Sequence, residues 1–324
     1  MIEKCLIIGL GQIGLQYDMY LKNNYVLSHS RAISLHPKFE LIAATDKNKQ
    51  NRDFFFKNYK KPVFSNLKKA LTETKPSIII ISTPSNSHLS ILEEILEIYS
   101  PKTILCEKPL ELSLNKAKKM VKLCKKKNIN LYVNYFRRSD PGSIKIKKMI
   151  NEKIIKAPIK GFVWYSKGIK NNGSHFINLL EYWLGKCNET LYLSKGKYYK
   201  TLSDSDYNFI LKFNNAEIIF QSSPEASKSY NSIELISKSG RLIYENGGEH
   251  IYWQSVFEKY IKNKSRKYLN KKKMIQNTLD KYQLNVLNAL YDSLQGNDSN
   301  ICTGEQSLET LKTIDKIIFN KELK

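Results

Sequence analysis

Lys108 is the first residue whose type and position suggest chemistry. It follows a short apolar run, residues 103–106, and the charged Glu107, and it precedes Pro109. In an open parallel sheet the carboxyl ends of the strands face the crevice where ligands bind, so a lysine there meets a cofactor or a substrate. Pro109 biases Lys108 towards an extended conformation, which helps to aim the ammonium group. The alternative is a strand that ends at an ordinary solvent edge, where lysine and proline are common.

His175 is the second such residue. It opens a run whose apolar side chains share one helical face and which ends at Gly185. Asn171, four residues earlier, shares a face with His175 if the turn before the helix is itself helical. An imidazole has the unperturbed pKa best matched to moving a hydroxyl proton near neutral pH, so we interpret His175 as an acid/base. The alternative is a histidine that caps the helix or fills the core.

A glycine-rich turn, Gly9-Leu10-Gly11-Gln12-Ile13-Gly14, directly follows the apolar strand expected at residues 5–8. This is the dinucleotide fingerprint in its required order of strand, turn and helix start. Gly9 makes the turn, Gly11 lets the backbone approach a pyrophosphate, and Gly14 permits close helix packing. The phosphates are expected at the N-terminus of the following helix, where N–H groups and the helix dipole favour anions.

Asp46 ends the second expected strand, residues 39–45. A carboxylate at this position accepts hydrogen bonds from the adenosine ribose and repels a 2′-phosphate, which favours NAD over NADP. Lys47 weakens that preference because its charge offsets the repulsion. The gap from the glycines exceeds the usual ~20 residues, which we attribute to an insertion around residues 17–28. A helix N-cap is the alternative role for Asp46.

Two further loops carry candidate ligands. Thr83 and Pro84 follow the Ile-rich strand expected at residues 77–82, and Thr83 and His88 could line the nicotinamide end of a cofactor. For His88 we favour cofactor contact or loop packing over catalysis. Arg137 and Arg138 are adjacent in an arginine-poor chain and could fork onto phosphate or carboxylate. Surface ion pairs are the alternative for these two arginines.

The elements that must position these residues form two parts of an α/β protein. Strands and helices alternate up to about residue 133, which predicts a doubly wound Rossmann domain with a parallel sheet. After Gly185 the strand-like runs follow one another without helices, which predicts a C-terminal α/β domain with a large, mostly antiparallel open sheet. These runs are residues 189–194, 206–213, 217–222, 232–237 and 241–245, followed by helices at about 275–295 and 305–319.

The expected domains are a dinucleotide-binding domain at residues 1–120 and a substrate-binding and oligomerisation domain at residues 121–324. The C-terminal helices could pack back on the first domain. No apolar run approaches the roughly 20 residues that span a bilayer, and the start of the chain has no signal-peptide layout. The five cysteines include no C-x-x-C pair that would suggest zinc or a redox dithiol. We therefore expect a cytoplasmic protein without a metal site, whose cysteines are mostly reduced core residues.

The 324 residues carry a formal charge of +23, and residues 259–273 are dense in lysine, with Tyr260 and Tyr268 interleaved. This pattern invites a nucleic-acid interpretation. Only six of the 53 basic residues are arginine, however, and arginine is favoured for contacts to phosphate and guanine. We therefore favour solvated lysine-rich faces, which could still help to collect an anionic substrate.

Together, these motifs resemble the Gfo/Idh/MocA family of glucose-fructose oxidoreductase and inositol dehydrogenase. The members of this family are NAD(P)-dependent enzymes that oxidise a ring hydroxyl of a sugar or cyclitol, or reduce the ketone. The resemblance implies a dinucleotide domain followed by an α/β domain whose open sheet usually mediates oligomerisation. The matching positions are Gly9 to Gly14, Asp46, Thr83-Pro84 with His88, Glu107-Lys108-Pro109, Arg137-Arg138 with Pro141, and His175 with Asn178 and Gly185.

Carried over, the resemblance places Lys108 by the nicotinamide and the reacting oxygen, and it makes His175 the acid/base. Many members have aspartate four residues before this histidine and again three after it, where this chain has Asn171 and Asn178. An amide can orient a hydroxyl but cannot take a proton, so the acid/base role falls more heavily on His175 and Lys108. Asparagine at such a site resembles the branch that acts on nucleotide-linked sugars in surface-polysaccharide synthesis.

Two functional hypotheses follow. The first is an NAD(P)-dependent sugar dehydrogenase, with a sugar or nucleotide-sugar substrate and a homo-oligomeric assembly, in which Lys108 and His175 converge over the nicotinamide. The second is a non-catalytic dinucleotide-sensing or nucleic-acid-associated protein that uses its basic surface. For the first, the candidate residues are Lys108, His175 and Asn171 for catalysis; Gly9, Gly11, Gln12, Ile13, Gly14, Asp46, Thr83, Pro84, His88, Glu107 and Lys108 for the cofactor; and Arg137, Arg138, Asn171 and Asn178 for the substrate.

Overall fold

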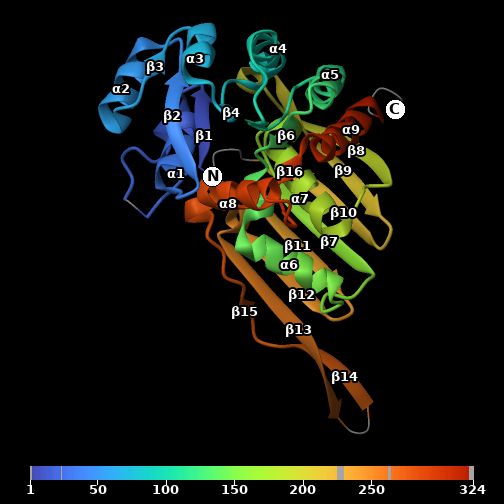
Figure 1. Cartoon of the computed structure of the whole chain (residues 1–324). Helices are drawn as coiled ribbons and strands as arrows, with labels where there is room; N and C mark the ends of the chain where they lie inside the picture. The colour runs from blue at the N-terminus through green and yellow to red at the C-terminus, as the bar shows by residue number, and fades with distance from the viewer. Residues whose placement is uncertain (1, 23, 225–229, 262–263, 321–324) are drawn as a thin grey trace. The chain divides into compact units, whose positions relative to one another are not determined.

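The computed structural model describes residues 2–22, 24–224, 230–261 and 264–320. The chain divides into two compact units, which Figure 1 draws in one colour gradient. Unit 1 comprises Met1–Ser139 and Asp280–Leu308, and unit 2 comprises Asp140–Leu279 and Glu309–Lys324. The domain boundary expected at residue 120 falls inside helix α5 (Leu114–Lys126), and the residues from there to Ser139 count with unit 1.

Unit 1 is built on a seven-stranded sheet in the order β16-β6-β5-β4-β1-β2-β3. Neighbouring strands are parallel except at the edge, where β16 runs antiparallel to β6. The order reverses between β1 and β4, which is the switch point at which a doubly wound sheet binds its ligand. The strands are β1 (Glu3–Ile8), β2 (Phe39–Thr45), β3 (Val63–Phe64), β4 (Ile78–Ile81), β5 (Thr103–Cys106), β6 (Asn130–Val133) and β16 (Cys302–Thr303).

Helices cover both faces of this sheet, which explains why the central strands are apolar without alternation. All four isoleucines of β4 are fully buried. Ile78 and Ile80 share a core with residues of α1, α2 and α8, so Ile79 and Ile81 face the other side, where α3, α4 and α5 pack in succession. The helix bounds are α1 (His29–Leu35), α2 (Lys49–Tyr59), α3 (Leu67–Thr74), α4 (His88–Ile98) and α8 (Tyr282–Leu294).

Unit 2 is built on a nine-stranded open sheet in the order β14-β13-β12-β11-β7-β10-β9-β8, with β15 paired to β13. Among the described pairs, only β7 and β10 are parallel. β10 forms an antiparallel hairpin with β9 and pairs with β7 on its other side. The strands are β7 (Ile159–Tyr165), β8 (Glu189–Tyr199), β9 (Asp204–Phe213), β10 (Ala216–Ser222), β11 (Ser232–Ser237), β12 (Gly240–Glu245), β13 (His250–Ile261), β14 (Lys264–Leu269) and β15 (Lys273–Met274).

Three helices pack on one face of this second sheet: α6 (Pro141–Asn151), α7 (Ser174–Leu184) and the part of α9 (Gly304–Asn320) that belongs to unit 2. Figure 1 shows α6 and α7 lying across β7, β10 and β11. Inward side chains such as Tyr165, Phe209 and Phe220 meet Phe176 and Trp183 of α7 in the core. The face of α7 predicted to be apolar is therefore the face that the sheet buries.

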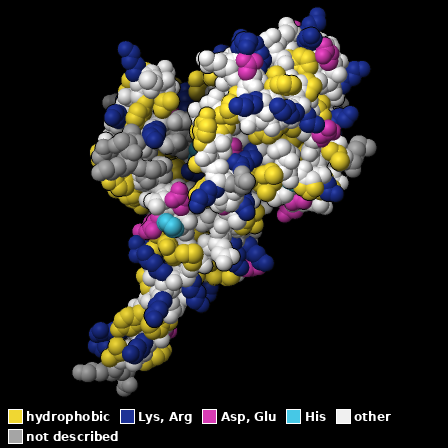
Figure 2. Space-filling view, turned by 90° about the vertical axis from the view of Figure 1, so that its left-hand side faces the viewer, with side chains coloured by type: hydrophobic (Ala, Val, Ile, Leu, Met, Phe, Trp, Pro, Cys, Tyr) yellow, Lys and Arg dark blue, Asp and Glu magenta, His cyan; other side chains and the backbone are white. Residues whose placement is uncertain are grey.

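Strands β13 and β14 continue beyond the rest of the second sheet as a two-stranded arm, residues 256–261 and 264–269 (Figure 1). All its described residues from Phe257 onward are exposed. Figure 2 shows hydrophobic and basic side chains next to one another along the arm. The lysine-dense stretch seen in the sequence therefore forms most of a two-stranded ribbon that is exposed to water on both faces. Residues 262–263 of this stretch lie outside the described part of the chain.

The fold class predicted from the sequence is confirmed in both units, but one helix was placed wrongly. The helix expected at 275–295 begins only at Tyr282. Ile275 instead donates its backbone N–H to Ile251 of β13 at 2.8 Å, and Thr278 donates to the Asp140 carboxylate at 2.9 Å. These distant partners hold residues 275–278 in a non-helical conformation, which periodicity alone does not reveal, and a short 3-10 turn, η7 (Leu279–Lys281), leads into the helix.

Two expectations about the polypeptide as a whole can be compared with the structure. All five cysteines are buried, as predicted for core residues. Among the residues that the structure describes, no helix has both the length and the apolar character needed to cross a membrane.

Candidate functional site

The glycine turn of unit 1 has the geometry that its three glycines predict. Gly9 has φ +98°, a backbone conformation that residues other than glycine rarely adopt. A Cβ atom on Gly14 would collide with the carbonyl oxygen of Gly9, so the chain packs against itself there. A Cβ on Gly11 would meet nothing within 4 Å. The backbone at Gly11 is therefore open on the side from which a pyrophosphate could approach.

The helix expected after these glycines is short. It is one π-helical turn, η1 (Gln12–Gln16), and the next helix starts only at His29. The insertion between them is closed by the buried carboxylate of Asp18, which accepts hydrogen bonds from the backbone N–H groups of Leu27 and Ser28 at 2.7 and 2.8 Å. Phosphate binding here would depend mainly on N–H groups of the glycine turn, because a single turn aligns few peptide dipoles.

Asp46 lies at the end of β2 and is bonded directly to the glycine turn. Its Oδ2 accepts the N–H of Leu10 at 2.6 Å, and its Oδ1 accepts the N–H of Asn48 at 2.7 Å. The N-cap of α2 is Asn48, so the alternative that Asp46 caps this helix was wrong. Arg52, which the sequence analysis did not single out, donates to the backbone oxygens of Asp46 and Lys47, both at 2.8 Å. A cation thus stands near the candidate ribose site.

Lys108 is half-buried at the end of β5, and the Lys108–Pro109 peptide bond is cis. Beneath it, the buried Oε1 of Glu107 accepts hydrogen bonds from His29 Nε2 at 2.8 Å and from Asn134 Nδ2 at 2.6 Å. Asn134 also donates to Gln283 at 3.1 Å. Burial alone would raise the pKa of Glu107, but His29, Asn134 and the charge of Lys108 hold that pKa below its ordinary value. Glu107 is therefore an ionised, buried support next to Lys108.

The loops after β4 and β5 are joined through His88, which is completely buried. Its Nε2 lies 2.9 Å from the carbonyl oxygen of Thr83, and its Nδ1 lies 3.0 Å from that of Leu110. Thr83 also approaches the glycine turn, since a Cβ on Gly9 would lie 2.9 Å from the Thr83 methyl group. The structure thus brings Thr83 beside the glycines and gives His88 the contacts of a loop-packing residue.

Arg137 and Arg138 lie in the short 3-10 turn η3 (Phe136–Ser139) at the end of the first segment of unit 1. Arg138 is only 5% exposed, which does not fit the surface-ion-pair alternative for this residue. The Arg137 guanidinium lies 4.7 Å from the centre of the Phe136 ring, which in turn stacks on Tyr282 at 4.3 Å. Arg137 therefore packs on an aromatic ring of unit 1 and Arg138 is buried, and the substrate-binding role of both arginines stays a prediction.

In unit 2, Asn171 and His175 lie on one continuous helical run. Asn171 is part of the π-helical turn η4 (Gly168–Gly173), which leads directly into α7. The segment before α7 is therefore helical, which is the condition for Asn171 and His175 to share a face. His175 is 6% exposed, and the Asn171 side chain donates to the carbonyl oxygen of Lys167 at 3.2 Å. The imidazole thus stands at the start of a buried helix, on a turn that local hydrogen bonds hold in place.

Asn178 is buried one helical turn further along α7. Its Nδ2 donates to Thr310 Oγ1 of α9 at 2.9 Å, and Thr310 in turn donates to Glu181 at 2.6 Å. These contacts tie α7 to α9 within unit 2. The amide therefore has a packing role in the fold, and its expected contact with a substrate stays a prediction.

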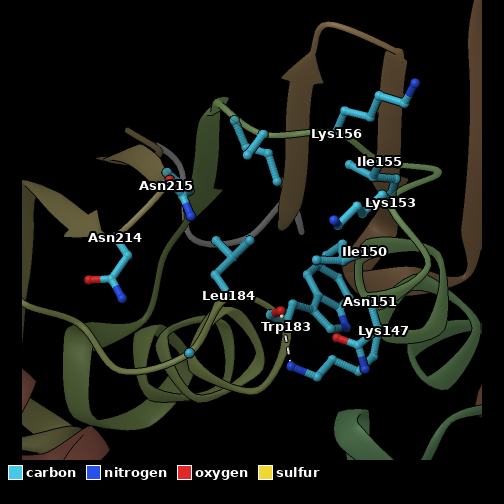
Figure 3. Close-up of a pocket in the computed structure, with 14 residues that line it drawn as sticks. Lys147, Ile150, Asn151, Lys153, Ile155, Lys156, Trp183, Leu184, Asn214 and Asn215 are labelled. Carbon is cyan, nitrogen blue, oxygen red and sulfur yellow. Dashed lines mark hydrogen bonds between the residues drawn. The ribbon is translucent and has the colours of Figure 1, made fainter.

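A hollow of about 620 Å³ lies at the other end of α7 (Figure 3). It is bounded by the end of α6, the Trp183–Gly185 segment and the turn between β9 and β10. Lys147 reaches across it and donates to the carbonyl oxygen of Trp183 at 3.2 Å. Its lining residues include none of the residues predicted for the site.

Sequence reasoning missed several residues that shape these surroundings. His29 contacts Glu107 directly, and Gln283 accepts a hydrogen bond from Asn134, which also donates to Glu107. Asp204 and Asp206 bond to the turn that bears Asn171. Each has other polar residues close to it in the sequence, so it gives no signal of its own. Only the contacts of the folded chain distinguish such residues from ordinary surface positions.

A comparison with protein families supports the assignment of unit 1. Residues 3–135 match the family model described as "Oxidoreductase family, NAD-binding Rossmann fold". A segment of 81 residues, 25% of this chain, is 33% identical to the D-xylose 1-dehydrogenase (NADP(+)) of Haloarcula marismortui and covers 22% of that protein. The chain spans less than a third of the length of the curated relatives it matches.

Solved structures resemble nearly the whole chain. An oxidoreductase from Agrobacterium radiobacter, in complex with NAD+, L-tartaric acid and magnesium, has a TM-score of 0.75 at 16% identity, over 97% of this chain and 95% of that one. The WlbA dehydrogenase from Bordetella pertussis, in complex with NADH and UDP-GlcNAcA, has a TM-score of 0.73 at 15% identity, over 98% of this chain and 94% of that one. At such identities the likeness establishes the fold.

Proposed function

We propose that this chain transfers a hydride between a nicotinamide dinucleotide and a ring hydroxyl or ketone of a sugar, because its residues 3–135 match the model of the oxidoreductase family with an NAD-binding Rossmann fold. The glycine turn carries this proposal, since Gly9 has φ +98° and the space beside Gly11 is open. The nicotinamide, when bound, supplies the hydride acceptor or donor. The protein supplies binding, orientation and proton transfer.

The residues of unit 1 fit a dinucleotide. The open backbone at Gly11 would receive the pyrophosphate, and the Asp46 carboxylate would accept hydrogen bonds from the adenosine ribose. Arg52 and Lys47 stand next to Asp46 and reduce the repulsion that its charge would exert on a 2′-phosphate. We therefore expect NAD to be the better cofactor and NADP to bind more weakly.

Proton transfer is assigned to Lys108 and His175. A half-buried ammonium at the end of β5 can hydrogen-bond a sugar oxygen and stabilise negative charge on it. An imidazole at the start of α7 can remove the hydroxyl proton or return it. Asn171, one turn earlier, can orient a hydroxyl through its amide but cannot carry its proton.

The substrate class that we favour is a nucleotide-linked sugar, as used in the synthesis of surface polysaccharides or other glycans. Three features support it: asparagines at positions 171 and 178, the paired Arg137 and Arg138 for a phosphate or carboxylate, and the basic composition of the chain. The WlbA dehydrogenase, whose fold this chain shares, binds UDP-GlcNAcA together with NADH.

The first experiment measures binding and turnover with the whole protein. Fluorescence titration with NADH and NADPH gives the cofactor affinities, and reduction of NAD and NADP is followed against a panel of nucleotide sugars, free sugars and inositols. With the substrate that this panel identifies, Lys108→Ala and His175→Ala should each lower kcat by about 10²- to 10⁴-fold. Their Kd for NADH should stay within a few-fold of the wild-type value.

A matched control removes a lysine of the same charge elsewhere in unit 1. Lys122 is exposed on α5, so Lys122→Ala should leave kcat unchanged. A Lys108→Ala protein with near-wild-type turnover would refute the mechanism. Failure to bind either reduced cofactor, together with tight and steeply salt-dependent binding of DNA or RNA, would support the non-catalytic alternative instead.

A further inference from the structure

The turn η4 receives its hydrogen-bond acceptors from a strand instead of from a local capping residue. The N-cap position, Lys167, makes no side-chain capping bond. The N–H of Gly168 donates to Asp206 Oδ1 at 2.8 Å, and the N–H of Asn171 donates to Asp204 Oδ2 at 3.0 Å. The N–H of Lys170 also donates to Asp204 Oδ2, at 2.8 Å. Helix starts expose N–H groups that need acceptors, and β9 provides them here.

Both carboxylates are buried, which makes this arrangement costly to maintain without full hydrogen bonding. Asp204 is 7% exposed and Asp206 is 0% exposed. The remaining oxygens are also used: Asp204 Oδ1 accepts the N–H of Ser205 at 2.9 Å, and Asp206 Oδ2 accepts the hydroxyl of Tyr199 at 2.7 Å. Burial raises the pKa of both aspartates, and these hydrogen bonds act in the opposite direction.

Gly168 allows the turn to approach the strand this closely. It has φ +88°, and a Cβ atom there would collide with the carboxylate of Asp204. Any side chain at position 168 would push the turn away from β9. The glycine and the two aspartates are therefore fitted to one another.

We propose that Asp204 and Asp206 are positioning residues for the reaction assigned above: they fix the turn that carries Asn171 and leads into α7 at His175. Neither aspartate needs to touch the substrate for this role. The inference rests on the proposed function for its catalytic consequence, whereas the hold of the carboxylates on the turn can be measured independently of activity.

The two aspartates offer a matched pair of substitutions because their partners differ in chemistry. In Asp204→Asn, the new NH₂ group must face a backbone N–H, either that of Ser205 or those of Lys170 and Asn171, so a donor meets a donor. In Asp206→Asn, the carboxamide oxygen can still accept from Gly168 while its NH₂ donates to the Tyr199 hydroxyl, which can accept. The first substitution should therefore release the turn, and the second should be tolerated.

The experiment compares these two variants with the wild type and with Glu217→Gln. Glu217 is half-buried on β10 and forms an ion pair with Lys160 of β7. Hydrogen–deuterium exchange of peptides covering residues 168–175 reports on the turn, and steady-state kinetics report on the reaction. For Asp204→Asn we expect faster exchange in that segment and a kcat lowered by about 10- to 100-fold. The Kd for NADH should not change, and the other two variants should behave like the wild type.

Unchanged exchange over 168–175 with kcat within twofold of wild type in Asp204→Asn would overturn the proposal. If that variant does not fold, Asp206→Ala takes its place, since it removes the acceptor for Gly168 without placing a donor against one; exchange of 168–175 as slow as in the wild type would then overturn it. If the wild type turns over no substrate of the panel, faster exchange in Asp204→Asn still supports the hold on the turn, and only the proposed function fails.

Discussion

At the scale of the residue, the glycine turn shows how one residue type can serve three purposes. Gly9 is required by its φ angle, Gly14 by the closeness of the Gly9 carbonyl, and Gly11 by neither. The backbone at Gly11 instead borders open space, where we expect a pyrophosphate to approach. That distinction separates a folding requirement from a binding requirement within six residues.

Alanine substitutions should separate these requirements. Gly11 has φ −74° and ψ −155°, which alanine can adopt, so Gly11→Ala should change the free energy of unfolding by no more than about 0.5 kcal/mol. It should nevertheless raise the Kd for NADH at least about tenfold, because the new methyl group occupies the approach of the pyrophosphate. Gly14→Ala should instead lower the free energy of unfolding by about 1–3 kcal/mol or more.

Thermal or urea unfolding and NADH fluorescence titration measure the two effects. Equal NADH affinity in Gly11→Ala and in the wild type would mean that no phosphate approaches this backbone. Equal stability of all three proteins would mean that the packing at Gly14 is looser than the structure indicates.

At the scale of the element, the sequence predicts strands and their ends better than it predicts what supports them. The apolar run before Lys108 is β5, and its carboxyl end lies where a parallel sheet presents ligands. The support beneath Lys108 could not be foreseen, because His29 is 78 residues from Glu107 and Gln283 is 149 residues from Asn134. Hydrogen bonds between such distant positions depend on the order of the strands in the sheet. The hydrophobicity pattern of the sequence does not reveal that order.

The Glu107 network gives a pH-dependent prediction. Because the pKa of Glu107 is lowered in the folded protein, its ionised form contributes stability above the unfolded-state pKa of about 4.3, and that contribution is lost as the pH falls below it. Glu107→Gln should therefore lower the free energy of unfolding by about 1–3 kcal/mol at pH 7, since it leaves a buried group poorly paired. The difference from the wild type should shrink below about pH 4.3.

Urea titrations at a series of pH values test this, with Glu97→Gln as the control because Glu97 is exposed on α4. A difference between wild type and Glu107→Gln that is independent of pH would show that the ionisation of Glu107 does not stabilise the fold. A pH-dependent loss in the Glu97→Gln control would point to a general effect of net charge.

At the scale of the whole molecule, the division into a parallel and a mostly antiparallel sheet followed from the order of apolar runs. The arm of β13 and β14 did not, since lysines occupy both of its faces and erase the alternation that marks a half-buried strand. In β7 the burial alternates but the residue type does not: Val163 and Tyr165 are buried, while the apolar Trp164 is 39% exposed. The open face of the second sheet is therefore unusually apolar for a surface in water.

Across that face, half-buried apolar side chains lie in register on four neighbouring strands: Leu191, Ile210, Ile219 and Phe162. Trp164 and the exposed Ile236 extend the patch. A patch of this kind marks an interaction site, and we expect it to join two copies of this chain. Trp164→Glu should then raise the dissociation constant of the oligomer at least about tenfold, because it buries a charge at the contact.

Light scattering after size-exclusion chromatography measures the assembly over a range of protein concentrations. Trp164→Phe is the matched control, since it keeps an aromatic side chain and should keep the assembly. A wild-type protein that remains monomeric at high concentration would contradict this expectation.

Three contacts that hold the glycine turn come from unit 1: the Asp46 carboxylate, the carbonyl oxygen of Thr45 and the Ser82 hydroxyl. The contacts that hold the Asn171 turn come from β9 of unit 2. We therefore expect mutations that reshape the second set to leave the first intact. During evolution, lineages could drift towards new substrates while inheriting an unaltered redox half, so that one ancestral scaffold diversifies by changes in a single module.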